Sequence, residues 1–320
     1  MVFRFIVGFL LVVPLPIFAA LFPSFNGALE VSLSPSSPQA GEVVTARVEN
    51  ISSSGSTHFV WKINGTVVDQ GIGITQTTFS VKGLGSATTV SVSATENGVP
   101  RGEKTLVIRP AEVDIVWEGN TATPSFYSGL PLPNPDSTIT LLAVPHLIQN
   151  GARVSADDIT YTWFVNNSQK PADFGYGRKK ITLTPPQFLN EFFVSVEAKT
   201  RGGDIVAKNT VVIAPQRPSV LVYEKAPLLG FLFEEAVTDS FSLTENEVTF
   251  VAFPLYINRT SSPTYQWSIN GESVSAVEGN PREITFRREG VGSGRHAVGF
   301  SFESAQVLFE RAATNFLITF

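Results

Sequence analysis

Three stretches of the chain alternate apolar and polar residues. The first begins at residue 90 and reads VSVSATENG, so that valine and alanine alternate with serine. The stretches VSVEAKTRGG from residue 194 and VGFSFES from residue 298 show the same alternation of apolar and polar residues. A period of two places successive side chains on opposite faces of an extended strand. We therefore predict one half-buried β-strand within each of these stretches.

A tryptophan-centred motif precedes each alternating stretch. Trp61, Trp163 and Trp267 stand in the sequences FVWKING, YTWFVNN and YQWSING, and they are separated by 102 and 104 residues. The alternating stretches begin 29, 31 and 31 residues after these tryptophans. An Asn-Gly pair tolerates positive φ at both central positions of a tight hairpin. We predict such turns at 64–65 and 270–271, with Asn-Asn at 166–167 as a weaker version.

Further strand-like segments recur around each tryptophan. Each copy has an apolar segment before the tryptophan (VVTARV, TITLLAVP and EVTFVAFP) and a closing segment (TLVIRP, TVVIAP and TNFLITF). The second and third copies also begin alike, with VDIVWEG and VLVYEKA. Six or seven short strands, with a tryptophan in the third strand, are typical of an Ig-like sandwich, in which the buried ring bridges two sheets.

The repeat predicts an all-β chain of three tandem Ig-like β-sandwich domains after an N-terminal signal or anchor segment. The predicted boundaries are 1–28 for that segment, 29–110 for the first sandwich, 111–216 for the second and 217–320 for the third. A solenoid does not fit, because solenoid repeats have periods of about 20 to 50 residues. The prolines that follow the first two closing strands open short linkers, RPAE and PQRPS.

The amino-acid composition argues against several classes of function. Hydrophobic residues make up 43% of the 320 residues, enough for packed cores, whereas charged residues make up only 16%, so Ser, Thr, Asn and Gln must build the polar faces. The net charge of −5 argues against a nucleic-acid binder. The basic run at 178–180 is expected to be a solvated loop. Because cysteine is absent, thiolate zinc sites, iron–sulfur clusters and cysteine nucleophiles are excluded.

The N-terminus has the features of an export signal. Arg4 is the only charged residue before Glu30, and the apolar run FIVGFLLVVPLPIFAALF lies between them. A short basic region followed by an apolar region is typical of a signal peptide. Two prolines interrupt the run and weaken a continuous membrane helix, although its length can just span a bilayer. We expect either cleavage or a retained membrane anchor.

No pattern in the chain indicates catalysis. His58, His146 and His296 occupy different places in the three copies, and neither HExxH nor G-x-S-x-G occurs. Asp136 and Asp157 could contribute to Ca²⁺ sites at domain ends, but no dense run of acids supplies the six to eight oxygen ligands that Ca²⁺ takes. We expect no catalytic residue, no cofactor and no metal, and a Ca²⁺ site at a domain end stays open.

Two inserts carry apolar residues outside the repeated strands. The second copy has TPSFYSGLPLPNPDS between its first two strands, and the third has APLLGFLFEEAVTDS in the matching place. They contribute a candidate partner-binding surface of Phe126, Tyr127, Leu130, Phe231 and Phe233. Apolar loop patches mark interfaces. The alternative is packing on the insert's own sandwich or between neighbouring domains, which the short linkers favour in part.

The Y-x-W-x-x-N-G core with its flanking strands resembles the bacterial Ig-like and PKD-like domains of exported cell-surface proteins, from about residue 29 onward. PKD domains usually place Gly-Asp-Gly after the tryptophan strand, where this chain has KINGTVV and SINGESV. A generic Ig-like assignment therefore fits better. The resemblance implies an Ig-like fold and a cell-envelope setting, and it implies no particular partner.

These observations predict a non-enzymatic, exported structural or binding protein of the cell envelope. It would form a semi-rigid arm of several Ig-like domains for adhesion or surface assembly, contacting a protein partner and no nucleic acid. It would be tethered by the N-terminal segment or released after cleavage. The sequence identifies neither the partner nor the oligomeric state.

Two other functions stay open. The chain could be a carbohydrate-binding or accessory module of an extracellular enzyme system, because sandwiches bind sugars through exposed aromatic rings. Trp117 and Tyr223, at equivalent positions near the domain starts, are candidates for such contacts, and core or interdomain packing is their alternative role. An enzyme with a site assembled between domains is the third hypothesis.

Overall fold

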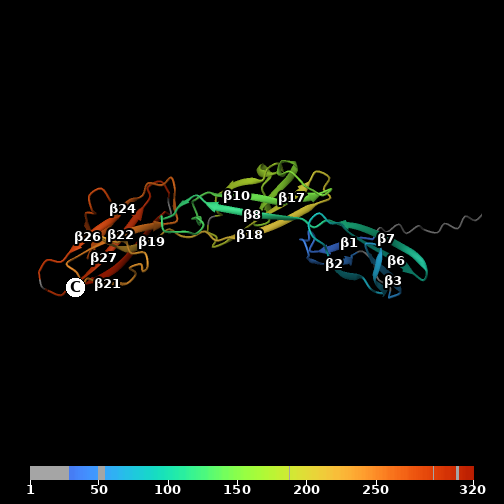
Figure 1. The fold of residues 1–320 in the computed structure, drawn as a ribbon, viewed down its shortest axis with the longest axis horizontal. Coiled ribbons are helices and arrows are strands. Elements are labelled where there is room, and N and C mark those ends of the chain that lie inside the picture. Colours follow the sequence, from blue (N-terminus) through green and yellow to red (C-terminus); the bar gives the residue numbers. More distant parts are fainter. Residues whose placement is uncertain (1–28, 50–54, 187, 291, 308–309) are drawn as a thin grey trace, which may run out of the picture. The chain divides into compact units, whose positions relative to one another are not determined.

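The computed structural model describes residues 29–49, 55–186, 188–290, 292–307 and 310–320 (Figure 1). Their secondary structure is β-strand apart from two 3₁₀ turns, Ala156–Asp158 and Pro171–Asp173, which confirms the all-β prediction. The predicted signal or anchor segment at 1–28 lies outside the described residues. Within the described part, no helix has the length and apolar character needed to cross a bilayer.

The first copy of the repeat contains seven strands in two sheets. In chain order they are β1 (Val31–Ser34), β2 (Val43–Val48), β3 (Thr57–Ile63), β4 (Thr66–Ile72), β5 (Gln76–Ser80), β6 (Thr88–Glu96) and β7 (Val99–Ile108). One sheet has the order β1-β2-β5 and the other has the order β4-β3-β6-β7.

The second copy, here called sandwich 2, repeats this arrangement. Its strands are β8 (Glu112–Gly119), β9 (Thr121–Ala122), β10 (Ile139–His146), β11 (Ile148–Gln149), β12 (Ala152–Arg153), β13 (Ile159–Val165), β14 (Ser168–Gln169), β15 (Gly175–Tyr176), β16 (Lys180–Leu183), β17 (Phe192–Thr200) and β18 (Val206–Ile213). The main sheets have the orders β8-β10-β16 and β14-β13-β17-β18, and both contribute to one hydrophobic core.

The third copy, sandwich 3, follows the same plan with two additions. Its strands are β19 (Ser219–Ala226), β20 (Gly230–Phe231), β21 (Ser240–Ser242), β22 (Glu247–Leu255), β23 (Ile257–Asn258), β24 (Thr264–Ile269), β25 (Glu272–Val274), β26 (Glu283–Arg287), β27 (Arg295–Glu303) and β28 (Arg311–Thr319). One sheet is β20-β19-β22-β26, and the other is β25-β24-β27-β28 with β21 parallel to β28. β20 and β21 are the additions to these two sheets, and the short β23 lies outside them in a two-stranded sheet with β9.

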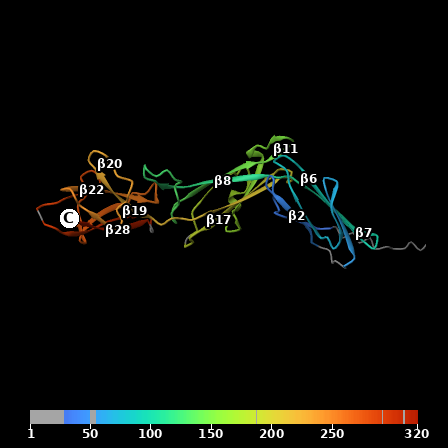
Figure 2. The same cartoon turned by 60° about the horizontal axis from the view of Figure 1, so that its bottom comes forward.

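The shared strand order identifies the fold. In every copy the first, second and fifth main strands form one sheet, while the fourth, third, sixth and seventh form the other (Figures 1 and 2). Neighbours in the sheets of sandwiches 2 and 3 are antiparallel, apart from the added β21, and β3 of the first copy is antiparallel to β4 and β6. Two sheets with this exchange of strands are the Ig-like arrangement. The chain is therefore an array of Ig-like β-sandwiches, as predicted, while the exact domain boundaries stay predictions.

The tryptophans and the alternating strands form the cores. Trp61, Trp163 and Trp267 are all buried, and each pairs with the alternating strand of its own copy. In β6, β17 and β27 the residues predicted to face the core are buried, which confirms the prediction of period-two strands. Burying a large aromatic side chain is worth several kcal/mol, so these rings anchor each copy.

The asparagine turns are confirmed in all three copies, and each asparagine also forms two hydrogen bonds to a residue in or beside the alternating strand. Both central residues of each turn have positive φ, including the weaker Asn-Asn pair. The asparagine side-chain oxygen accepts a hydrogen bond from the backbone N–H of a residue in or beside the alternating strand, and the asparagine N–H donates to the carbonyl of that residue. The pairs are Asn64 with Thr89, Asn166 with Phe193 and Asn270 with Ala297.

The described residues divide into two compact units. One unit holds the described residues within 29–32, 46–77 and 89–106, and the other holds those within 33–45, 78–88 and 107–320. The sheet β4-β3-β6-β7 belongs to the first unit, apart from the ends of β6 and β7. Sandwiches 2 and 3 both belong to the second unit, so the contacts between their segments lie within it.

Candidate functional site

The two inserts meet in one aromatic cluster. Phe126, from the insert of sandwich 2, lies 4.2 Å from Phe233 between ring centroids, 5.4 Å from Tyr223 and 5.2 Å from Phe253. Phe231 joins the cluster at 5.4 Å from Phe233. Among all eight ring pairs of Phe126, Tyr223, Phe231, Phe233 and Phe253, six are edge-to-face, the geometry that aromatic quadrupoles prefer. Three of the five predicted site residues, about 100 positions apart in sequence, are thus brought together.

The cluster exists because β22 is apolar on both faces. Phe250 and Ala252 face the core of sandwich 3, while Val251 and Phe253 face the other side, next to Tyr223 of β19. An apolar outer face is stabilised when other side chains cover it and exclude water. Phe126 and Phe233 provide the cover and are themselves partly buried. Much of their apolar surface is therefore used within the chain, in the packing role that the sequence left open.

Backbone pairing joins the same segments. β9 pairs antiparallel with β23, through Thr121 with Asn258 and Ala122 with Ile257. Ala122 also packs against the core of sandwich 3. We call the contact of residues 119–137 with sandwich 3 the junction. A two-strand ladder across the junction couples the sandwiches through the backbone as well as through side chains.

Side-chain hydrogen bonds add to the ladder at the junction. The Asn134 amide donates to the Tyr256 carbonyl at 2.7 Å, and Arg259 Nε donates to the Thr121 carbonyl at 3.1 Å. Asn134 is buried. In the linker, the Gln216 N–H donates to the Pro133 carbonyl at 2.7 Å. Because a buried polar group that loses its partner is destabilising, these bonds hold the junction in one arrangement.

A buried carboxylate supports the β23 side of the junction. Glu310 is almost fully buried and accepts hydrogen bonds from the Asn258 N–H and the Ser261 hydroxyl. Gly119 supports the other side, since a Cβ there would lie 2.6 Å from the Pro133 nitrogen. Only glycine allows the insert to approach β8 this closely. The insert is thus fixed at both ends of its path.

The remaining predicted site residues, Tyr127 and Leu130, lie in the same insert. The Tyr127 hydroxyl donates to the Leu130 carbonyl at 3.1 Å. Burial raises the pKa of Tyr256, and the nearby Tyr127 phenol raises it further. Leu130 remains 43% exposed and Phe231 41% exposed. These two side chains, rather than Phe126 or Phe233, offer free apolar surface for a partner.

The most exposed apolar residues of the inserts were not singled out from the sequence. Leu228 and Leu229 form the turn between β19 and β20 and are 97% and 80% exposed. Their place in the quoted insert gave no sign of exposure, because the β19–β20 hairpin is too short to show a period of two. The pairs Lys225–Phe231 and Ala226–Gly230 define that hairpin.

The aromatic residues considered for glycan contacts are packed to different degrees. Tyr223 is buried in the aromatic cluster, while Trp117 is half-buried against the core of sandwich 2. Two other rings of sandwich 2 are about half exposed: Phe174 is 52% exposed and Tyr176 is 51% exposed. The Arg201 guanidinium lies over the Tyr176 ring, 5.1 Å from its centroid, in a cation–π contact.

An open groove of about 500 Å³ lies beside Arg201. Its lining includes Gln149, Arg153, Asp158, Thr200 and Arg201. The groove is mainly polar, and its two arginines give it a positive balance over the single carboxylate. It is formed by the turn between β17 and β18 and the segment that leads from β11 to the first 3₁₀ turn.

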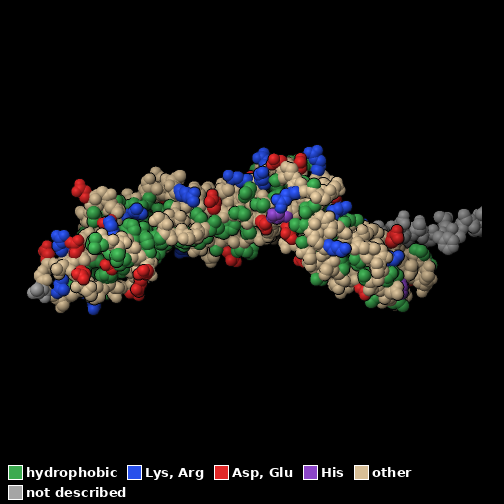
Figure 3. Space-filling view, in the orientation of Figure 1, with side chains coloured by type: hydrophobic (Ala, Val, Ile, Leu, Met, Phe, Trp, Pro, Cys, Tyr) green, Lys and Arg blue, Asp and Glu red, His purple; other side chains and the backbone are tan. Residues whose placement is uncertain are grey.

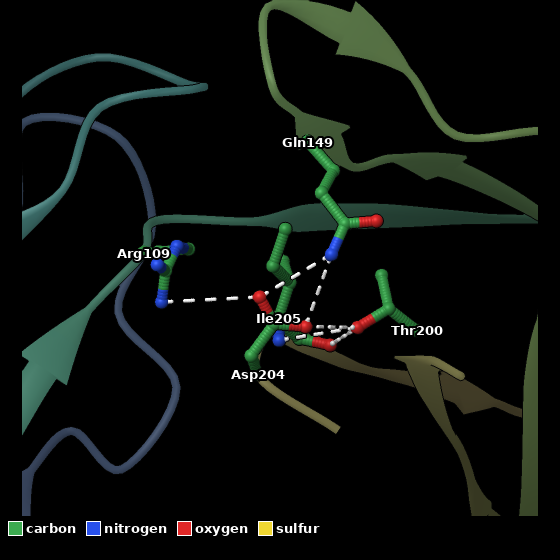
Figure 4. A network of polar contacts seen from close by, with 5 residues as sticks. All are labelled: Arg109, Gln149, Thr200, Asp204 and Ile205. Atoms are coloured by element: carbon green, nitrogen blue, oxygen red, sulfur yellow. Dashed lines mark hydrogen bonds and ion pairs between the residues drawn. The ribbon is translucent and has the colours of Figure 1, made fainter. Parts of the chain in front are cut away.

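A network centred on Asp204 holds one side of the groove (Figure 4). The Thr200 hydroxyl donates to Asp204 at 2.9 Å, the Gln149 amide lies 3.3 Å from both carboxylate oxygens, and Arg109 lies at 3.9 Å. The Thr200 hydrogen bond lowers the pKa of Asp204 against the opposing effect of burial, and Gln149 and Arg109 lower it further. The carboxylate therefore stays charged near neutral pH and orders the groove wall.

No group of three or more His, Asp or Glu side chains is placed to hold a metal ion among the described residues. Asp136, one of the acids considered for Ca²⁺, lies in a turn in which its N–H donates to the Asn134 side chain. Asp157 forms an ion pair with Lys179 at 3.4 Å. Both acids thus take part in local structure.

Comparison with protein-family models and with curated proteins finds no match to this chain. Among solved structures, the chain is similar to three N-terminal domains of the bacteriophage RB49 highly immunogenic outer capsid protein, at 12% identity over 91% of this chain and 97% of that one, with a TM-score of 0.28. It is also similar to the central fibronectin-III array of RIM-binding protein, at 13% identity over 90% and 95%, with a TM-score of 0.31.

A third similar structure contains Sidekick-1 immunoglobulin domains 1–4, at 13% identity over 90% of this chain and 74% of that one, with a TM-score of 0.22. All three are multi-domain proteins, and all three TM-scores are low. The Ig-like assignment therefore rests on the strand order and registers of the chain itself.

Proposed function

We propose that the chain is an exported, non-enzymatic structural or binding protein of the cell envelope, a semi-rigid arm of Ig-like sandwiches for adhesion or surface-assembly contacts. The observation that carries this proposal is the junction. A ladder, buried hydrogen bonds and an aromatic cluster couple sandwiches 2 and 3. Neighbouring domains move independently unless their interface is large and apolar, so this coupling is what a stiff arm requires.

The resemblance of the sequence to Ig-like domains of exported bacterial cell-surface proteins supports the envelope setting, as does the apolar N-terminal run. Leu130 and Phe231, together with the exposed leucines of the β19–β20 turn, are the surface we propose for a protein partner. Exposed apolar groups on otherwise polar sandwiches favour such contacts.

Stiffness can be tested with spin labels, because the chain has no cysteine of its own. Ser168→Cys and Glu272→Cys place one label on each sandwich at exposed positions. Diluted with unlabelled chain, the doubly labelled protein should give one narrow distance distribution. Adding Phe126→Ala and Asn134→Ala should broaden it, while Phe174→Ala, away from the junction, should not. A broad distribution in the parent protein would refute the stiff arm.

Export needs a separate test. Cells expressing the full chain with Ser168→Cys are treated with a membrane-impermeant maleimide, and the cysteine-free parent serves as the control. Labelling of intact cells is expected. Labelling only after lysis would rule out a surface location. The N-terminus of the mature protein then separates the two arrangements, since an intact Met1 in the membrane fraction indicates a tether and a new terminus between residues 21 and 29 indicates release.

The alternative is a carbohydrate-binding or accessory module. The observation that favours it is the exposed Tyr176 ring beside the polar groove, since sugars stack on aromatic faces and hydrogen-bond to polar side chains. A glycan array with the parent protein and Tyr176→Ala tests this function. Glycan binding by the parent protein that is lost in Tyr176→Ala would support carbohydrate binding. Absence of binding by the parent protein to any glycan on the array would count against it.

A further inference from the structure

The turn between β19 and β20 presents an apolar tip. We call residues 227–231 the leucine tip, since Leu228 and Leu229 point almost entirely into solvent. The paired strands β19 and β20 hold the tip, and Gly230 adopts the positive φ that the return of the chain requires. Two neighbouring exposed leucines on an ordered hairpin indicate a surface that is covered in an assembly.

The surroundings of the leucine tip are acidic. Residues 224–239 contain one base, Lys225, and four acids: Glu224, Glu234, Glu235 and Asp239. The Lys225 ammonium is paired with Glu283 at 2.9 Å, so its charge is already neutralised. Anionic lipid surfaces and nucleic acids would be repelled. The tip therefore fits an acceptor that combines apolar side chains with basic ones.

Sandwich 2 carries an acceptor of this description. The exposed rings of Phe174 and Tyr176 lie in a segment with a basic excess, and Arg201 covers Tyr176 on the side of the groove. Among the described residues, the nearby bases without a carboxylate partner within 4.0 Å are Lys170, Arg178, Lys180 and Lys199, while Lys179 is paired with Asp157. Figure 3 shows several Lys and Arg side chains over this sandwich, with Asp and Glu side chains among them. We call these rings and the adjoining groove the basic aromatic surface.

The leucine tip does not reach the basic aromatic surface of its own chain. The groove lies at the start of β8, because its Asp204 network includes Arg109, whereas the junction lies at the other end of β8. In sandwich 3 the junction adjoins Ser219, and the tip follows Ala226 at the far end of β19. Each of these strands has eight residues, or about 26 Å.

We propose that the leucine tip of one chain docks on the basic aromatic surface of a second copy of this chain. Both surfaces expose apolar side chains. Their charges are opposite, because the surroundings of the leucine tip are acidic and the basic aromatic surface is basic. This head-to-tail contact is heterologous, so each added copy leaves one tip and one acceptor free, and assembly continues. The inference deepens the proposed surface-assembly function by naming the partner, but its test uses purified protein and does not depend on export.

Disulfide trapping tests the contact directly. Leu228→Cys and Tyr176→Cys are prepared as separate full-length chains, mixed and oxidised. The mixed disulfide should dominate over both homodimers by mass spectrometry. Val212→Cys, at another exposed apolar position of sandwich 2, replaces Tyr176→Cys as the matched control and should give only background. Equal yields from Tyr176→Cys and Val212→Cys would overturn the proposal.

Charge exchange tests the recognition. In sedimentation experiments at low salt, the parent chain should self-associate, and Glu234→Lys with Glu235→Lys should weaken association about tenfold or more. Arg178→Glu with Lys180→Glu should do the same, and mixing the two double variants should restore association. Glu103→Lys, on β7, is the control and should leave it intact. A parent chain that stays monomeric at every concentration, or variants without mutual rescue, would overturn the proposal.

Discussion

Trp163 of sandwich 2 and Trp267 of sandwich 3 occupy the same strand position but differ in their polar contact. The Trp163 indole N–H donates to the Arg178 carbonyl at 2.9 Å. The Trp267 indole nitrogen is buried and has no acceptor among the described residues. In the first copy, Trp61 donates to the Ile74 carbonyl at 2.8 Å. Burial of the ring is therefore common to all copies, whereas the hydrogen bond is not.

The segment that follows the tryptophan hairpin explains the difference. In sandwich 2 this segment returns to β13 as β15, and the turn after β15 brings the Arg178 carbonyl to the indole. In sandwich 3 the chain leaves β25 for a small turn closed by a bridge between Val277 and Asn280. The comparison shows that the apolar pattern determines whether the ring is buried, while loop geometry determines whether its indole N–H has a hydrogen-bond acceptor.

The largest effect expected is loss of the ring itself. Trp163→Ala and Trp267→Ala should each destabilise their own sandwich by about 3–5 kcal/mol, and so should Trp61→Ala in the first copy, because a large buried side chain is deleted. Denaturant unfolding monitored by circular dichroism measures the change, with Val212→Ala as an exposed control. An unchanged transition in any tryptophan variant would show that the ring is not a core element there.

A smaller effect separates the two rings. Trp163→Phe should destabilise sandwich 2 by about 1–2 kcal/mol more than Trp267→Phe destabilises sandwich 3, because only the former deprives a carbonyl of its donor. Replacing Trp267 removes a buried N–H that has no acceptor, which offsets part of the lost packing. The same denaturant experiment compares the two free energies of unfolding. Equal losses would contradict the difference between the indole groups.

The hairpin turns extend the comparison. Sandwich 2 has Asn167 at φ 63°, where sandwich 3 has Gly271 at φ 86°. Glycine adopts positive φ without the steric penalty of a side chain, so Asn167→Gly should stabilise sandwich 2 by about 0.5 kcal/mol. Gly271→Asn should destabilise sandwich 3 by a similar amount. Shifts of the same sign in the two thermal unfolding curves would refute the matched roles of the two positions.

The smallest effect concerns pH and sandwich 2 alone. Because the pKa of Asp204 is lowered from 3.8, chiefly by the Thr200 hydroxyl, its stabilising contribution is present above about pH 4 and is lost as the pH falls through the lowered value. Thr200→Val should therefore reduce the acid dependence of unfolding for sandwich 2. Identical acid titrations of the parent and the variant, followed by circular dichroism, would exclude this role of Thr200.

The candidate site was only partly predictable. Phe126, Phe231 and Phe233 were found from the sequence because aromatic residues stood outside the repeated strands. Their mutual contact was not predictable, because it depends on which outer face of β22 needs cover and on the path of an insert about 100 residues earlier. Leu228 and Leu229 were missed, since the three-residue turn 227–229 is too short to have a periodicity from which exposure can be inferred.

The sequence by itself determined the strands, the buried tryptophans and the asparagine turns. These features depend on local propensity and on a period of two, and both act over a few neighbouring residues. Only the tertiary structure decided that β9 pairs with β23, that Asn134 donates to Tyr256, and that Trp267 lacks an acceptor. Those outcomes depend on the paths of irregular loops, which long-range packing and not local pattern determines.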